Sequence, residues 1–374
     1  MVEIRAGDDD TMAPLLKLLD ELLYGGEEQA SVGPGGAELV AGWRRGLSAG
    51  VRQYLRGYHR AGSQAEGRAL FVDVAERFPR VAAMAGLSYA ALFLPFLVGA
   101  SMGCQGFVVD CSAVGERLGK STAQKVVASL AGHPLFLIRS FNATPITIGN
   151  LLAASHGMPL MLEDTPLLVV SGRESSGKCV GRLIESVARG RVATGAEAGR
   201  SRATRAFNAV MVIASREPLS GIRGVAQQEG ALDHVVSLGP PFGEFAREVG
   251  DYIAYTVAPT ICANYGHIVP VLVSGLLQRA QALGGLAALE EELRAKHRQH
   301  IERTVLLLGR TGDLAGDCRA TRLAEILGAG TLALAHLLDA SGVDAARAAL
   351  IIAAARSAVL ADNEDALAAL SLVR

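Results

Sequence analysis

The feature that most constrains the fold is a junction between an apolar run and a helical pattern near residue 119. The apolar run is GFVVDC (106–111), a loop containing glycine follows, and KSTAQKVVASLAG (120–132) then has helical spacing. A strand that passes through such a loop into a helix is the setting of a phosphate-binding P-loop, because backbone N–H groups at the helix N-terminus bind phosphate oxygens. We therefore predict a phosphate site here.

The residue types at this junction suit a nucleoside triphosphate with Mg²⁺. Gly115 and Gly119 border the loop, Lys120 adds a positive charge, and Ser121 and Thr122 offer hydroxyls to the metal. Three residues separate Gly115 from Gly119, one fewer than in the usual motif. ATP and Mg²⁺ are the expected ligands.

A second string competes with the first. GRESSGKC (172–179) has the usual glycine spacing and follows the apolar run LLVVSG, but Cys179 stands at the hydroxyl position. A thiol is a poor ligand for a hard cation such as Mg²⁺. We prefer the first string, and we interpret 172–179 as a surface loop.

The first string also has an acidic partner further along the chain. The apolar run 158–162 leads into Glu163 and Asp164, whose carboxylates are expected to hold Mg²⁺ and polarise the attacking water. A later apolar run, Val210–Ala214, leads into Ser215, which we predict to sense the γ-phosphate. Arginines and glycines fill the segment between these runs, either as a hairpin that displays arginines or as a solvated loop.

Short apolar runs alternate with helical stretches from about residue 70 to 240, which indicates an α/β layer structure. Strands are expected at Phe107–Cys111, Leu135–Ile138, Leu160–Leu162, Val210–Ala214 and Val235–Leu238. We predict a P-loop NTPase core at 70–244, a parallel sheet flanked by helices. A helical region precedes it at 1–69 and a helical subdomain follows at 245–374.

Composition excludes several alternatives. The net charge of −1 gives no overall attraction to nucleic acid, and five cysteines without a CxxC pair argue against a disulfide framework or a zinc site. His297 and His300 are interpreted as solvent-facing. Two long uncharged stretches, 81–109 and 252–278, are interrupted by glycine, proline and polar residues, so we expect buried segments rather than membrane spans. A cytoplasmic protein without a membrane partner is expected.

The segment from Gly86 to Ala335 resembles a helicase-like P-loop ATPase family of unassigned function carried by prophages, plasmids and integrative elements. The resemblance follows the order of several strings. They are LSYAALFLPFLVG (87–99), GKSTAQKVVASLAGHP (119–134), PLMLEDT (159–165), RLIESVARGRVATG (182–195), AVMVIASREPLSG (209–221) and NYGHIVPVLVSGLL (264–277). The order of Glu163 and Asp164 departs from the family, which usually has Asp first.

The resemblance implies a ring-forming motor of the RecA or AAA+ division. It implies DNA-dependent ATP hydrolysis, a hexamer, and Arg200, Arg202 or Arg205 as arginine fingers that act on a neighbouring subunit. The leading hypothesis is an ATP-dependent DNA helicase or translocase that serves a mobile element. The alternative is a catalytically weak or inactive derivative that works as an oligomeric nucleotide- or DNA-binding scaffold.

Overall fold

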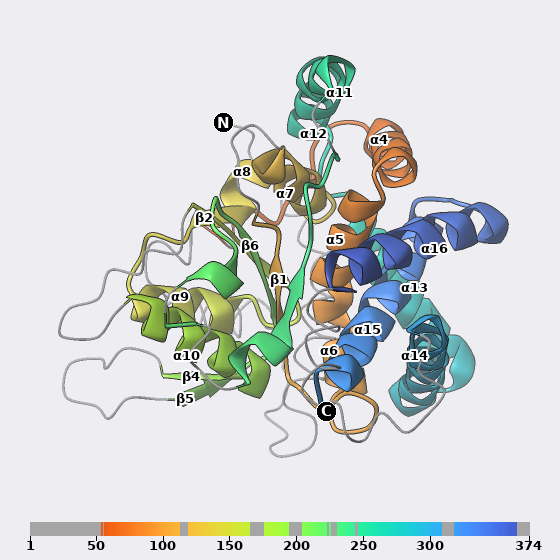
Figure 1. Ribbon diagram of the computed structural model, residues 1–374. Helices are drawn as coiled ribbons and strands as arrows, with labels where there is room; N and C mark the ends of the chain where they lie inside the picture. Colours follow the sequence, from red (N-terminus) through yellow and green to blue (C-terminus); the bar gives the residue numbers. More distant parts are fainter. Residues whose placement is uncertain are drawn as a thin grey trace, which may run out of the picture.

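A five-stranded, wholly parallel β-sheet forms the centre of the computed structural model (Figure 1). The structure describes residues 54, 56–112, 119–164, 176–193, 204–222, 224–225, 230–243, 246–308 and 318–364. In spatial order the strands are β2 (Ile138–Ser140), β3 (Pro159–Glu163), β6 (Val210–Ala214), β1 (Phe107–Asp110) and β7 (Val235–Ser237). The predicted α/β class with a parallel sheet is confirmed.

One predicted strand begins later than expected. Residues Pro134–Leu137 form a helical turn, α8, and β2 begins only at Ile138. Pro134 supplies a fixed φ suited to the first helical position, and the His133 ring nitrogen accepts a hydrogen bond from the Leu135 N–H. The prediction of a strand at Leu135–Ile138 is therefore wrong for its first residues, because an apolar run alone does not separate a buried strand from a helical turn.

Helices cover both faces of the sheet. Figure 1 shows α9 (Pro145–Ala154) and α10 (Ser176–Arg189) on one side and α5 (Pro79–Tyr89) on the other. Helix α7 (Lys120–Ser129) contacts β2, β3 and β6 and also packs on α5. A two-stranded antiparallel pair, β4 (Arg191–Ala193) and β5 (Thr204–Ala206), follows α10.

The string that competes as a P-loop is partly helical. Ser176 to Cys179 form the first turn of α10, where Gly177 and Cys179 are buried. The interpretation of a surface loop is wrong for these residues, because the apolar face of the helix extends to its first turn. Residues 165–175, which include the start of this string and the apolar run before it, lie outside the described part of the chain.

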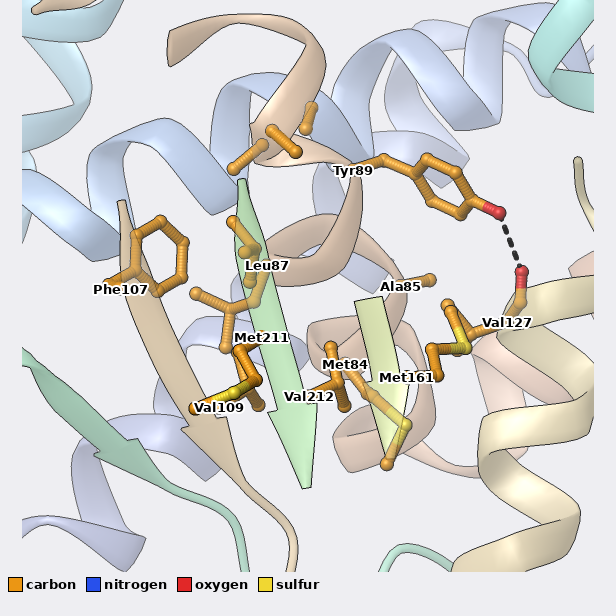
Figure 2. Packing of buried hydrophobic residues seen from close by; sticks show 14 of the residues in the cluster. Met84, Ala85, Leu87, Tyr89, Phe107, Val109, Val127, Met161, Met211 and Val212 are labelled. Atoms are coloured by element: carbon orange, nitrogen blue, oxygen red, sulfur yellow. Dashed lines mark hydrogen bonds between the residues drawn. The ribbon is translucent and has the colours of Figure 1, made fainter. Parts of the chain in front are cut away.

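Helix α5 is the centre of the hydrophobic core. From Val81 to Tyr89 every residue is buried, and Figure 2 shows Met84 and Leu87 gathered with sheet residues such as Val109 and Met211. The Tyr89 hydroxyl donates to the Val127 carbonyl of α7 at 2.9 Å. Strand β1 and helix α7 thus both pack against one buried helix.

From Arg247 onward the described residues form a helical region, of which two helices pack on α5 (Figure 1). Its members are α11 (Arg247–Tyr252), a π-helical segment (Ile253–Val257), α12 (Ala258–Ala263), α13 (Ile268–Leu283), α14 (Leu286–Leu307), α15 (Cys318–Ala340) and α16 (Ala345–Asp362). Toward the N-terminus, α4 (Gln64–Arg77) directly precedes α5 in the chain. Both α15 and α16 contact α5 directly.

The two uncharged stretches enter this architecture as short elements. Residues 81–109 contain α5, the 3-10 turn Ala90–Leu92, α6 (Leu94–Leu97) and β1, and 252–278 contain the π-helical segment, α12 and part of α13. Among the described residues, one helix is long and apolar enough to cross a membrane, Arg319–Ala340 within α15, with mean hydropathy 1.4. In the structure 78% of the most apolar 18-residue window of this helix is buried against other parts of the protein, as expected for a core helix.

His297 is not solvent-facing, contrary to the expectation from the sequence. It is fully buried, its ring nitrogens lie 2.7 Å from the Ser101 hydroxyl and 2.9 Å from the Glu325 carbonyl, and it packs on Gly328 of α15. The charged neighbours of His297 in the sequence hid this buried position. Across the described ranges, no three His, Cys, Asp or Glu side chains are grouped to hold a metal ion.

Candidate functional site

The candidate site lies at the carboxyl edge of the sheet, where β1, β6 and β3 end side by side. Asp110 of β1 is in register with Ile213 of β6, and Ala214 of β6 is in register with Glu163 of β3. Ligands of open parallel sheets bind outside this edge, because the loops that leave the strands meet there. The strand with the predicted acidic residues and the strand before the predicted P-loop are separated only by β6.

Helix α7 begins at this site with Gly119 as its N-cap. Gly119 has φ 73° and ψ 9°, in the left-handed region, and its lack of a side chain leaves no side-chain cap on the helix. A Cβ atom on Gly119 would stand 2.5 Å from Cδ2 of Phe242. The first helical turn holds no acidic residue. The first N–H groups of an α-helix have no partner within the helix itself, and together with the positive end of the helix dipole they suit an anion.

The predicted ligand-binding residues take up this first turn. Lys120 is the first residue of α7, Ser121 is exposed and Thr122 is half-buried. Burial lowers the pKa of Lys120, the positive charge of Arg216 lowers it further, and the negative charge of Asp110 raises it. Within the described residues, the charges of Arg216 and Asp110 thus both act on Lys120. Gly115, the other predicted glycine, lies outside the described residues.

A buried glutamine that the sequence did not single out fixes α7 to the sheet. Gln124 is wholly buried, and its Nε2 donates to the Leu162 carbonyl of β3 at 2.9 Å and to the Val212 carbonyl of β6 at 3.2 Å. These bonds hold the helix across the two strands that end in Glu163 and Ser215. The position of the first turn of α7 relative to those strand ends is therefore set by a side chain outside the predicted motif.

The two predicted carboxylates face different surroundings. Glu163 is half-buried as the last residue of β3, and its carbonyl accepts from the Phe141 N–H at 2.8 Å. Asp164 is exposed, has φ 79°, and accepts a hydrogen bond of 2.6 Å from the Ser140 hydroxyl of β2. Asp164 is thus bonded toward β2, on the far side of β3 from β6, whereas Glu163 is in register with Ser140 of β2 on one side and with Ala214 of β6 on the other.

Ser215 belongs to a buried hydrogen-bond network at the strand ends. Its side chain is 3% exposed, its hydroxyl donates to the Glu217 carbonyl at 2.6 Å, and its N–H donates to the Ser112 hydroxyl at 3.1 Å. The Ser112 and Ser215 hydroxyls are 2.7 Å apart. The hydroxyl predicted to sense phosphate therefore joins the ends of β6 and β1 in this structure.

Asp110 completes the network, although it was not among the residues predicted from the sequence. Its side chain is 2% exposed, and its carboxylate oxygens accept from the Ser112 N–H at 3.1 Å and the Leu219 N–H at 2.8 Å. Burial raises the pKa of this carboxyl, whereas the hydrogen bonds and the charge of Lys120 lower it. A charged residue inside an apolar run was the available signal, because such a residue is buried only when it is paired.

The predicted arginine fingers are only partly within the described residues. Arg200 and Arg202 lie outside them. Arg205 lies in β5, where its backbone pairs with Val192 of β4. The strands β4 and β5 run antiparallel, and the connection between them is outside the described chain.

Comparison with known proteins agrees with this architecture. Residues 51–204 match a domain of unknown function, DUF927. No curated protein matches the chain. Among solved structures, the chain is similar to the SCCmec type IV protein Cch, described as an active helicase, with a TM-score of 0.59 and 18% sequence identity.

The likeness to Cch is one of fold. It covers 79% of this chain and 50% of the Cch chain, so this protein spans about half the length of that helicase. The two matches fit the helicase-like resemblance of the sequence. Among the elements of the candidate site, the DUF927 match includes β1, α7 and β3. It ends in β5, before β6, the strand that leads into Ser215.

Proposed function

We propose that the chain binds ATP with Mg²⁺ at the carboxyl edge of the sheet and works as a DNA helicase or translocase motor. The observation that carries the proposal is the order of strands β3, β6 and β1. A helix whose N-terminus has no side-chain cap follows β1, a carboxylate ends β3, and the polar end of β6 lies between them. A triphosphate on the helix would place its terminal phosphate toward β6 and the carboxylate.

The residues of this edge fit the two ligands. Lys120 and the first N–H groups of α7 would bind phosphate oxygens, with Gly115, Gly119 and Thr122 shaping the loop and helix start. The Ser121 hydroxyl and Glu163 would hold Mg²⁺, which neutralises phosphate charge when bound. A group of one or two carboxylates is enough for Mg²⁺, because water and phosphate oxygens supply the other ligands.

Of the two acidic residues, Glu163 is proposed to orient the attacking water. It is the residue in line with β6, whereas Asp164 is bonded to Ser140 on the far side of β3. Asp164 is then a supporting group of the Mg²⁺ shell. Ser215 is proposed to sense the γ-phosphate through the network that joins it to Ser112.

The remaining parts of the proposal rest on the family resemblance and on the fold of a helicase. They are a hexameric ring, a single-stranded or forked DNA partner, and a trans-acting finger drawn from Arg200, Arg202 and Arg205. The site would then be completed by a neighbouring copy of the chain in the cytoplasm.

A second candidate is a catalytically weak derivative that binds nucleotide and serves as an oligomeric scaffold. Two observations favour it. The Ser215 hydroxyl is engaged by Ser112 and Glu217, and Asp164 is engaged by Ser140. In such a derivative, nucleotide would bind without turnover.

ATP hydrolysis by the full chain, with and without single-stranded DNA, tests the leading proposal. We expect Lys120→Ala to abolish turnover, because it removes the phosphate-facing charge, and Lys125→Ala on the same helix to retain it. Equal rates of ATP hydrolysis for the wild type and Lys120→Ala would contradict the proposal that the protein is an ATPase. Nucleotide binding without turnover in the wild type would favour the scaffold.

A further inference from the structure

A row of aromatic rings lies where three distant segments of the chain meet, beyond the end of α7. The row consists of Tyr265, His59, His133 and Phe136, and we call it the aromatic corner. The His59 ring centroid lies 5.3 Å from that of Tyr265 and 5.9 Å from that of His133. The His133 centroid lies 4.5 Å from that of Phe136, which belongs to α8 beside α7 (Figure 1). At these separations the rings form one continuous row.

Backbone contacts hold the three segments together. The Gly57 carbonyl accepts from the His133 N–H at 2.8 Å, and the Ala61 and Tyr265 N–H groups each donate to the other's carbonyl at 3.0 Å. A Cβ on Gly132 would stand 2.2 Å from the Gly57 carbonyl oxygen, so the chains touch there without room for a side chain. The aromatic corner is thus built in advance of any ligand, which lowers the cost of binding.

Hydrogen bonds within the corner engage the histidine nitrogens. In His59, one ring nitrogen lies 2.9 Å from the Arg56 carbonyl and the other lies 3.2 Å from the Tyr265 hydroxyl. In His133, Nδ1 accepts from the Leu135 N–H at 3.2 Å. Because both nitrogens of His59 are engaged, this ring contributes its flat face to the corner and does not serve as a metal ligand.

The row of rings runs from a buried end to an exposed end. Tyr265 is 8% exposed, and His59 and His133 are half-buried. At the other end, Phe136 is 39% exposed and Leu135 next to it is 55% exposed. An exposed ring that is supported by other rings offers a surface on which a flat ligand can stack.

The segments that form the corner carry positive charge. Residues 56–61, 133–139 and 264–267 contain three arginines and no Asp or Glu, and Arg56 is exposed. The carboxylate of Glu66 borders the corner, where it accepts from the Asn264 amide at 3.0 Å. Aromatic surface within basic segments suits flat bases on a phosphate chain better than it suits an acidic partner.

We infer that the aromatic corner is a stacking surface for the unpaired bases of a single-stranded nucleic acid, with Phe136 as the outermost ring and Arg56 on the phosphate chain. The inference deepens the proposed function, on which it rests for the nucleic acid partner. Aromatic faces stack on any base, and cations follow the backbone charge. Helix α7 begins at the candidate nucleotide site, and His133 follows four residues after its last residue, Ser129. One helix therefore joins the two sites.

The test is fluorescence anisotropy of the full chain with labelled oligo(dT) and oligo(rU), without nucleotide. We expect Phe136→Leu, which keeps an apolar side chain but removes the ring, to weaken single-strand binding about five-fold or more. Phe136→Trp should keep the wild-type affinity, because it replaces one stacking ring by a larger one. A loss with either strand supports the inference, and the strand that is weakened identifies the partner as DNA or RNA.

Matched variants separate stacking from charge. Tyr255→Ala removes an 80% exposed ring from the π-helical segment and should leave both affinities unchanged. Arg56→Gln should reduce the slope of log affinity against log salt by about 0.7, the contribution of one single-strand phosphate. Arg298→Gln, on the exposed surface of α14, should leave that slope unchanged. Phe136→Leu should not alter affinity for duplex DNA, whose bases are stacked within the helix.

Three results would overturn the inference. If Phe136→Leu binds both single strands as tightly as the wild type, with unchanged thermal unfolding, the corner does not stack on bases and the proposed function stands. If Phe136→Leu weakens self-association in sedimentation but not strand binding, the corner belongs to an interface with a second copy of the chain. If the wild type binds neither strand, the inference fails, and ATP hydrolysis without DNA decides the ATPase proposal separately.

Discussion

Gly119 is the residue on which the start of α7 depends. Its φ of 73° belongs to the left-handed region, and Phe242 occupies the space where a side chain would begin. The conformation lets the chain turn from the loop into the helix, and Phe242 packs directly on that turn. Two separate constraints, one of backbone and one of packing, therefore favour glycine here.

Gly119→Ala should both destabilise the fold and impair nucleotide binding. The left-handed conformation alone costs a non-glycine residue about 1–2 kcal/mol, and the 2.5 Å approach to Phe242 adds to that cost. Gly342→Ala is the matched control, because Gly342 has φ 81° but no atom within 4 Å of the added Cβ. Chemical denaturation of both variants measures the difference. Equal losses would mean that Phe242 yields without cost.

At this scale the sequence predicted the motif residues but not their partners. Gly119, Lys120 and Ser121 were recognisable because their order along the chain is itself the signal. Asp110 and Gln124 were not, because their neighbours come from other strands. Gln124 bonds carbonyls of β3 and β6, and Asp110 bonds an N–H far along the chain at Leu219. Such contacts exist only after the sheet has formed.

The crossing of α5 and α15 is the main contact between the sheet layer and the C-terminal helices. A Cβ on Gly86 of α5 would stand 2.5 Å from the Gly330 carbonyl of α15, and a Cβ on Gly330 would stand 2.8 Å from Leu87. The two helices therefore meet at a close approach of their backbones. Small residues on both sides permit it.

Gly86→Ala should destabilise the protein by about 1–3 kcal/mol, the usual cost of overpacking a core. Gly275→Ala in α13 is the control, since no atom lies within 4 Å of its added Cβ. Alanine there should stabilise the helix by up to about 1 kcal/mol. Thermal unfolding of the two variants should shift in opposite directions. A neutral Gly86→Ala would contradict the close approach.

Elements were predictable where the pattern was continuous and bounded. The strand at Val210–Ala214 agrees with β6, because a short apolar run rich in β-branched residues stands between Asn208 and Ser215. The run at 135–138 misled, because Pro134 starts a helical turn within apolar sequence. For His297 the prediction of a solvent-facing side chain was wrong, because its neighbours in the sequence are charged while its own ring is buried and packs on α15.

For the whole molecule, the order of strands carries more functional meaning than any single motif. The predicted P-loop has short glycine spacing, but the strand before it, β1, is separated only by β6 from β3, the strand that ends in Glu163. The same fold occurs in Cch, described as an active helicase, at 18% identity. Packing of α15 and α16 on α5 joins segments distant in sequence, which no local pattern reveals.

The most direct test of the central claim is ATP turnover by Glu163→Gln, measured beside nucleotide affinity. We expect turnover to fall about 100-fold or more, the usual loss when a general base is removed, while the variant still binds ATP through Lys120 and the start of α7. Asp339→Asn, an exposed change at the far end of α15, should leave both unchanged. Turnover in Glu163→Gln equal to that of the wild type would contradict a catalytic site at this edge of the sheet.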